Sequence, residues 1–212
     1  MNFRKTLIAV ISLLLLSLSL QAQAGKVPGV EGVYDTLPGE EFKFDGKAVE
    51  IVEYMSFYCH TCYEFEKYIP IIKDKYAGKI KWKTLPIYWS EHGSPKPGEA
   101  YLIAKDMGKG EEMKKAIFHA QMIQKKNIAD INVLESIGKE VGLGPEFIKK
   151  LRSGKKAGEA QKAIDMSKKI RVNETPTLVI AGNIVTNSHP MNHDLDIFRI
   201  NVMAIVTSIL KQ

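Results

Sequence analysis

The chain has 212 residues, which is ample for one domain with its core and a subdomain. Its formal charge is +6 at pH 7. The lysines occur mostly in pairs along predicted helices, as at Lys114-Lys115, without interleaved aromatic residues. This pattern indicates solvated helix faces and argues against nucleic-acid binding. No glycine-rich phosphate loop follows a strand, so we expect no organic cofactor.

The N-terminus has the three parts of a secretory signal peptide. Arg4 and Lys5 precede an apolar core at residues 7–20, and small residues lead up to Ala24. The core is shorter than the roughly 20 residues that a membrane-spanning helix needs. We therefore expect export with cleavage near Ala24, which leaves residues 25–212 as the mature domain.

Hydrophobic periodicity predicts an alternation of strands and helices along the mature chain. Residues 25–46 are rich in Gly and Pro and predict an irregular lead-in, with at most one short edge strand near Tyr34. Residues 51–58 form an apolar run that predicts a strand buried on both faces, and the residues after Cys62 predict one helix. The remaining predicted elements are a strand at 80–87, four or five helices within 97–172, a strand at 175–180, a hairpin turn at 181–183, a strand at 184–186 and a helix at 194–210. This order favours an α/β domain with an inserted helical subdomain.

The two cysteines of the chain, Cys59 and Cys62, lie where the strand predicted at 51–58 meets the helix that follows it. Unpaired N–H groups and the helix dipole at that position stabilise a thiolate, which is the form that attacks disulfides. As a structural cross-link, a bridge across so short a loop would stabilise the fold by only about 2 kcal/mol. The pair therefore favours redox chemistry over a structural role.

Glu53 lies inside the same apolar strand, where a carboxylate is costly to bury and needs a partner or a raised pKa. One interpretation is a side chain at a strand edge that reaches solvent or a lysine. The functional interpretation is that Glu53 lies beneath the disulfide and exchanges protons with Cys62.

Several of these features together resemble the DsbA family of exported thiol:disulfide interchange proteins. They are the Phe57-Tyr58-Cys59-His60-Thr61-Cys62 segment with its following helix, the inserted helical block, Thr175-Pro176, the short hairpin and the terminal helix, over roughly residues 40–210. The resemblance implies a thioredoxin fold with a helical insertion at about 97–172. It also implies that Cys59 is the nucleophile, that Cys62 is the buried resolving thiol, and that Thr175 precedes a cis Pro176 and pairs with an extended client.

The chain departs from the family pattern at two places. His60 and Thr61 stand between the cysteines where the best-known members have proline and then histidine; a protonated His60, or the hydroxyl or N–H of Thr61, can still stabilise the thiolate. The family's acidic residue falls on Glu53, but its basic partner falls near Thr84, which is no base. The adjacent Lys83 should point to the opposite face of its strand.

Two alternatives to an oxidase remain open from the sequence. One is a disulfide isomerase or reductase on the same fold. The other is a metal-binding protein or metal chaperone, in which His189 and His193, with zinc-like spacing, join the Cys59-His60-Cys62 group. If there is no metal, the loop that holds these histidines is expected to line an apolar groove for clients.

The sequence thus predicts a monomeric, periplasmic dithiol oxidase that donates its Cys59–Cys62 disulfide to newly exported proteins. Its redox group is that disulfide itself, so no cofactor and no metal are expected at the active site. The resemblance implies a quinone-linked membrane thiol oxidase, DsbB-like, as the partner that restores the disulfide.

Overall fold

The computed structural model describes residues 26–212, so the predicted signal peptide lies outside the described residues. A mixed sheet forms the centre of the molecule, with strand order β1-β5-β4-β2-β3. Its strands are β1 (Asp35–Thr36), β2 (Val49–Met55), β3 (Ile80–Pro86), β4 (Thr177–Ile180) and β5 (Ile184–Asn187). The pair β2 and β3 is parallel and the other neighbours are antiparallel. This is the α/β sheet of a thioredoxin fold.

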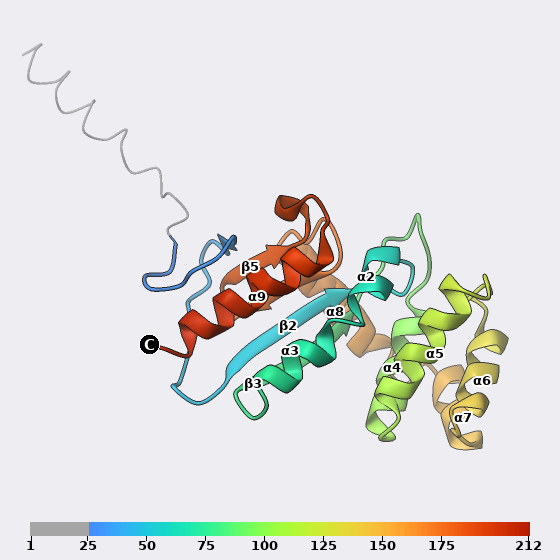
Figure 1. Cartoon of the computed structure of the whole chain (residues 1–212). Coiled ribbons are helices and arrows are strands. Elements are labelled where there is room, and N and C mark those ends of the chain that lie inside the picture. The colour runs from blue at the N-terminus through green and yellow to red at the C-terminus, as the bar shows by residue number, and fades with distance from the viewer. Residues whose placement is uncertain (1–25) are drawn as a thin grey trace, which may run out of the picture.

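The helices fall into two groups (Figure 1). Near the sheet lie α2 (His60–Phe65), α3 (Ile69–Lys75), α8 (Ala157–Lys169), the 3-10 turn η1 (His189–Met191) and α9 (Leu195–Ile209). Beyond the end of β2 lie α4 (Lys96–Asp106), α5 (Gly110–Met122), α6 (Ile131–Glu140) and α7 (Pro145–Arg152), which we call the helical block. In the part of the chain that the structure describes, no helix is long and apolar enough to cross a membrane.

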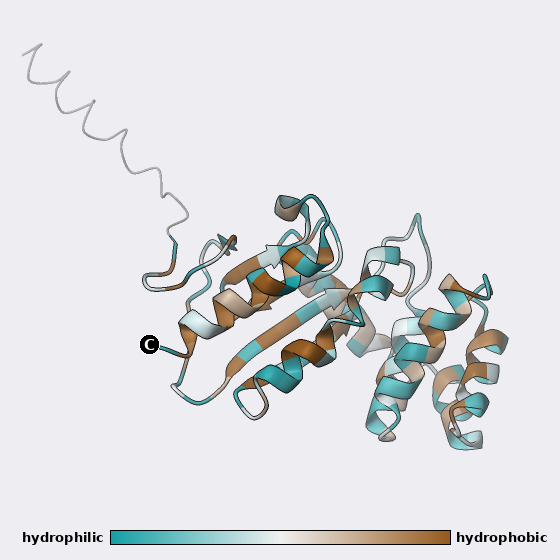
Figure 2. Ribbon diagram, in the orientation of Figure 1, coloured by the Kyte–Doolittle hydropathy of each residue, from teal (hydrophilic) through white to brown (hydrophobic). Residues whose placement is uncertain are grey.

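Two apolar layers cover the faces of the sheet. On one face, Ile51 and Leu178 pack with Phe65 of α2, and with α3 and the buried side of α9. On the other face, Tyr54 and Val179 pack against α8. Adjacent residues of β4 thus point to opposite layers, as the pleat of a strand requires, and all of its residues are buried. Figure 2 shows the corresponding hydrophobic colour along much of β2.

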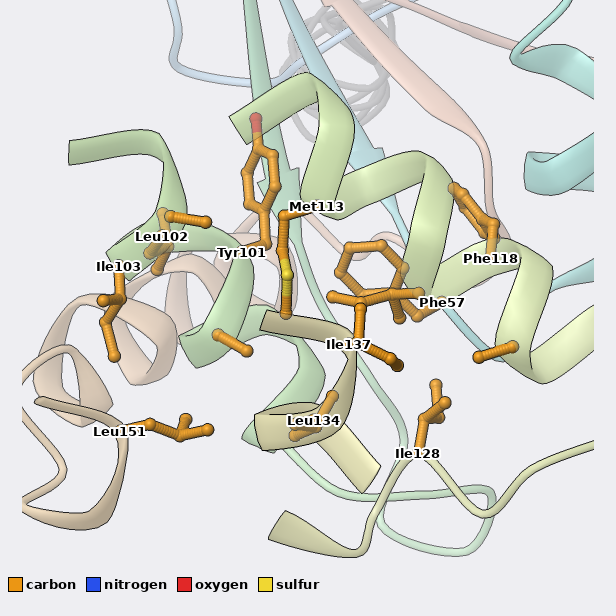
Figure 3. Close-up of a cluster of buried hydrophobic side chains, with 14 of the residues drawn as sticks. Phe57, Tyr101, Leu102, Ile103, Met113, Phe118, Ile128, Leu134, Ile137 and Leu151 are labelled. Atoms are coloured by element: carbon orange, nitrogen blue, oxygen red, sulfur yellow. The ribbon is translucent and has the colours of Figure 1, made fainter. Parts of the chain in front are cut away.

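The helical block has a separate core that reaches the two-cysteine segment. Phe57 and Phe118 pack with their ring centroids 5.0 Å apart, and Tyr101 lies at 6.2 Å from Phe57 (Figure 3). The buried Cys62 belongs to the same apolar cluster. The block therefore forms one wall of the site that the cysteines occupy.

Two predicted elements differ in detail from the sequence expectation. The strand predicted at 51–58 is β2, and it ends at Met55 instead of residue 58. Ser56 starts a turn in which its carbonyl accepts the Cys59 N–H at 3.1 Å. Glu50 in the outer half of β2 is exposed, so only the inner half is buried on both faces. The helix after Cys62 is divided into α2 and α3, since Pro70 in the first turn of α3 has no N–H to continue a helix.

Candidate active site

Cys59 is the N-cap residue of α2, and its sulfur accepts a hydrogen bond from the Cys62 N–H at 3.1 Å. Its backbone is extended, with φ −93° and ψ 117°, so the chain enters the helix at this residue. Both cysteines are free thiols; Cys59 is half-buried and Cys62 is buried. The predicted placement of Cys59 at the junction of a strand and a helix is confirmed, and the geometry leaves one thiol accessible and hides the other.

The loop before β4 lies against the exposed thiol. In its thiol form Cys59 donates to the carbonyl of Thr175, which lies 3.1 Å from its sulfur. The Thr175–Pro176 peptide bond is cis, as the family resemblance implied. Thr177 is held by a bond from its hydroxyl to the Glu174 carbonyl at 2.8 Å. The loop thus presents backbone atoms next to the sulfur at which exchange would occur.

The environment pulls the pKa values of the two thiols apart. The pKa of Cys59 is lowered to about 6, above all by a hydrogen bond from the Cys62 side chain. Hydrogen bonds from the Thr175 side chain, the Cys62 N–H and the Thr61 N–H add to this, against the cost of burial. The pKa of Cys62 is raised well above 9.0, because burial and the neighbouring Cys59 sulfur both disfavour a second thiolate. Near neutral pH the pair therefore holds one thiolate, at Cys59.

His60 and Thr61 contribute differently to this site. The N–H of Thr61 lies within hydrogen-bonding reach of the Cys59 sulfur. His60 is exposed, and its ring lies 6.3 Å from that of Tyr63. A role for the His60 side chain therefore stays a prediction.

Glu53 is completely buried and is held from the neighbouring strand. One carboxylate oxygen, Oε2, accepts from the Thr84 hydroxyl at 2.9 Å and from the Trp82 indole N–H at 3.0 Å. Thr84 is the residue opposite Glu53 in the parallel register of β2 and β3. The interpretation of Glu53 as a solvent-reaching edge residue is wrong, since it faces the interior.

A buried lysine that the sequence reasoning missed supplies the positive charge. The Lys114 ammonium of α5 lies 3.0 Å from Glu66 Oε2 and 3.2 Å from Glu111 Oε2, with its side chain 1% exposed. Burial alone would lower the pKa of Lys114, but Glu66, Glu53 and Glu111 outweigh burial and raise it. Lys114 thus stays charged. Its ion-pair partners are Glu66 and Glu111, and its charge acts on Glu53 through longer-range electrostatics from a helix instead of from β3.

The expectation that the Lys114-Lys115 pair lies on a solvated face is wrong for its first member. Lys115 is exposed, whereas Lys114 lies on the buried face of α5 with Ile117 and Phe118. The signal was in the sequence, because residues three and four positions apart share one side of a helix. A lysine in phase with two large apolar residues is therefore a candidate for burial.

Glu66 links this ion cluster to the cysteines. It follows Cys62 by one helical turn, and its N–H donates to the Cys62 carbonyl at 3.2 Å. Burial raises the pKa of Glu66 to about 7, with Lys114 acting against that rise and Glu53 adding to it. A carboxyl group with a pKa close to neutral can accept or supply a proton in the pH range where thiol exchange operates.

The histidines that suggested a metal site do not join the cysteines. Within residues 26–212, the side chains close enough to share an ion are Glu174, His189 and His193. Neither cysteine is among them, so the composite Cys-and-His metal site considered from the sequence is wrong.

Curated relatives of this chain are named thiol:disulfide interchange proteins. The thioredoxin family model matches residues 46–194. The DsbA of Haemophilus influenzae is 25% identical over 149 residues, covering 68% of this chain and 72% of that protein. The DsbA of Burkholderia cepacia is 26% identical over 144 residues, 65% of each chain. A solved DsbA structure from Xylella fastidiosa has a TM-score of 0.69 at 20% identity, and covers 87% of this chain and 97% of that one.

The lowered pKa of Cys59 predicts that the reduced protein gains stability as pH rises. A thiol with a pKa of about 6 when folded and near 9.0 when unfolded contributes stability that is fully present above pH 9 and is lost as pH falls through 6. Between pH 5 and pH 8 the reduced wild type should gain about 2–3 kcal/mol more than the C59S variant. Urea unfolding of both proteins under reducing conditions measures this, and an equal pH dependence in the two would contradict the lowered pKa.

Removal of the buried cation should destabilise the fold. The substitution Lys114→Met leaves the Glu66 carboxylate without its positive partner, so the free energy of unfolding should fall by about 3–5 kcal/mol. Lys115→Met changes an exposed neighbour on the same helix and should stay within about 0.5 kcal/mol of wild type. The double variant K114M/E66Q should recover part of the loss. Urea denaturation compares the four proteins, and similar effects of K114M and K115M would argue against the buried cluster.

Proposed function

The chain belongs to the thioredoxin family, and we propose that it is a periplasmic dithiol oxidase that passes its Cys59–Cys62 disulfide to newly exported proteins. The activity is that of a protein thiol:disulfide oxidoreductase. The observation that carries the proposal is the asymmetry of the two thiols: Cys59 is accessible with a pKa of about 6, while Cys62 is buried with a raised pKa. A stable Cys59 thiolate favours the reduced pair, which makes the disulfide a good oxidant.

Oxidation of a client proceeds in two exchanges. A client thiolate attacks the Cys59 sulfur, which forms a mixed disulfide and breaks the Cys59–Cys62 bond. Cys62 leaves with the electron pair and takes up a proton, because its pKa is raised in the buried site. A second client thiolate then attacks the client sulfur of the mixed disulfide and releases Cys59 as a thiolate. The client loses two electrons, which the cysteine pair gains.

The cis-proline loop is the proposed binding site for the client. The Thr175 carbonyl lies next to the Cys59 sulfur and receives no hydrogen bond from it when that sulfur is a thiolate or part of the disulfide. An extended client segment that donates a backbone N–H to this carbonyl would place its own cysteine beside Cys59, in the manner of a strand added to a sheet edge. Thr175 and Pro176 therefore orient the client, and exchange stays at the accessible sulfur.

Glu53 is proposed to serve the proton exchange of Cys62, together with Lys114 and Glu66. Support comes from its complete burial, its two fixed hydrogen bonds and its electrostatic coupling to Lys114. A buried thiol has little access to water, so its proton must come from and return to nearby side chains. In this arrangement Lys114 holds the positive charge that allows a carboxylate to remain in the interior.

The cellular setting follows from the same proposal. The signal at residues 1–24 would direct the chain to the periplasm with cleavage near Ala24, and residues 25–212 would act as a monomer with the helical insertion at about 97–172. After each turnover the reduced pair must be oxidised again. A quinone-linked membrane thiol oxidase of the DsbB kind is the proposed partner, as for the DsbA proteins that the chain resembles.

The oxidase proposal predicts that the oxidised mature protein introduces disulfides into reduced ribonuclease at stoichiometric concentration. The C59S variant should be inactive, since it lacks the sulfur that the client attacks. Equilibration with glutathione should give a reduction potential above about −200 mV. A potential near −270 mV would indicate a reductase. Efficient rescue of scrambled ribonuclease with weak oxidation of the reduced form would indicate an isomerase.

The role of Glu53 predicts a kinetic defect without a change at Cys59. Glu53→Gln keeps an acceptor for Thr84 and Trp82 but removes the acid, so reoxidation of the reduced pair by glutathione disulfide should slow by about 10-fold or more. Thiolate absorbance should still titrate with the wild-type midpoint for Cys59. The matched control is Glu64→Gln, which changes a carboxylate of α2 that is paired with Lys67. A wild-type reoxidation rate in E53Q would refute the proton role.

A further inference from the structure

A second group of reactive side chains lies beside the cis-proline loop and has no part in thiol exchange. Single ligand atoms of Glu174, His189 and His193 all lie within 4.8 Å of one another. We infer that these three side chains form a binding site for a divalent transition-metal ion, with Zn²⁺ as the ion expected. The inference concerns binding alone and stands independently of the oxidase proposal.

Local backbone geometry brings the two histidines together. His189 begins η1 and His193 follows it, after Asn192. Asn192 and His193 both adopt left-handed backbone conformations, with φ 52° and 61°, which are uncommon for residues other than glycine. The turn is fixed by the His193 N–H, which donates to the Ser188 carbonyl at 3.0 Å. As a result the two rings lie 5.2 Å apart, and such strained turns concentrate at functional sites.

The third ligand comes from a different part of the chain. Glu174 lies between α8 and β4 and directly precedes Thr175. By contrast, η1 lies between β5 and α9, in the red coil that follows β5 in Figure 1. Both histidines are exposed and Glu174 is half-buried, so the site opens to solvent. An ion can therefore enter without any rearrangement of the fold.

The donor set and its spacing suit zinc. Two imidazole nitrogens and one carboxylate oxygen are ligands that Zn²⁺ accepts in open sites, where water fills the fourth position. With bonds of about 2.0–2.1 Å, a tetrahedral ion needs ligand atoms roughly 3.4 Å apart. Side-chain rotations that bring the ligand atoms closer by up to about 1.4 Å would reduce the present spacing of at most 4.8 Å to that value. The Ser188 hydroxyl lies 3.4 Å from His193 Nδ1, which leaves Nε2 free to bind the ion.

The charged groups around the site set the expected strength of binding. Asp35 and Arg171 line the same groove, which has a volume of about 400 Å³ and also contains Glu174 and His189. The Asp35 carboxylate favours a cation, whereas the Arg171 guanidinium opposes one. We therefore expect a dissociation constant in the micromolar range instead of the much tighter binding of a structural zinc site.

Occupation of the site would have a consequence for the redox centre. Glu174 is the residue next to Thr175, whose carbonyl accepts from Cys59. An ion held by Glu174 and the two histidines would tie the cis-proline loop to η1, two segments that β4 and β5 separate along the chain. This consequence, unlike the site itself, depends on the proposed role of the loop in binding clients.

The test is calorimetric titration of the mature protein with ZnCl₂ while the Cys59–Cys62 disulfide is formed, so that the thiols cannot bind the metal. We expect one ion per chain, and at least about tenfold weaker binding in each of H189A, H193A and E174Q. Matched controls are H119A and H60A, which remove exposed histidines elsewhere and should bind as wild type does. A rise in melting temperature with zinc should occur in wild type and vanish in the H189A/H193A double variant.

Three outcomes would overturn the inference. They are no saturable binding below millimolar zinc, binding that H189A, H193A and E174Q leave unchanged, and binding that occurs only after the disulfide is reduced. The last result would place the ion on the cysteines. Ribonuclease oxidation in metal-free buffer is measured separately, so failure of the metal site and failure of the oxidase proposal give different results.

Discussion

Hydrogen bonding of the Cys59 sulfur by Cys62, from its side chain and its N–H, is the interaction on which the chemistry depends. It exists because β2 ends at Met55 and the turn at Ser56 delivers Cys59 to the N-cap of α2. An N-terminal N–H group has no partner within its own helix, so a thiolate in that position gains a strong, charge-assisted bond. A disulfide sulfur is neutral and gains much less. The helix terminus thus stabilises the reduced state selectively, which is what an oxidising disulfide requires.

The helical block converts two adjacent cysteines into two different groups. Its core continues through Phe57 to Cys62, so one sulfur is removed from water while the other stays at the edge of the cluster. Burial penalises a charge on Cys62 and leaves the charge to Cys59. Burial therefore decides which of the two thiols ionises. Cys62 follows Cys59 by about one helical turn and lies in the apolar interior.

Periodicity and helix breakers were sufficient to predict most elements, because they are local properties of the chain. The same reasoning misplaced Lys114, since its neighbour Lys115 is solvated and pairs of lysines usually are. Its spacing from Ile117 marked it as buried, and Glu111 is one helical turn away. No local pattern, however, indicates that Glu66 lies 3.0 Å from its ammonium. The sequence showed that Glu53 would be costly to bury. Its hydrogen-bond partners, Trp82 and Thr84, became evident only from the pairing of β2 with β3. Long-range charge clusters of this kind depend on tertiary packing.

The buried positive charge lies on α5 and not on the sheet, so the charge balance of the buried carboxylates depends on the position of the helical block. Thr84 gives Glu53 a neutral hydrogen bond, and the cation comes from Lys114 on an element that also packs on Phe57. The same ammonium joins α5 to Glu66 of the segment that follows Cys62. Any movement of α5 away from the sheet would therefore remove the cation from both carboxylates and expose the wall of the active site at once. In this chain the charge balance of the buried carboxylates therefore depends on the docking of the helical block.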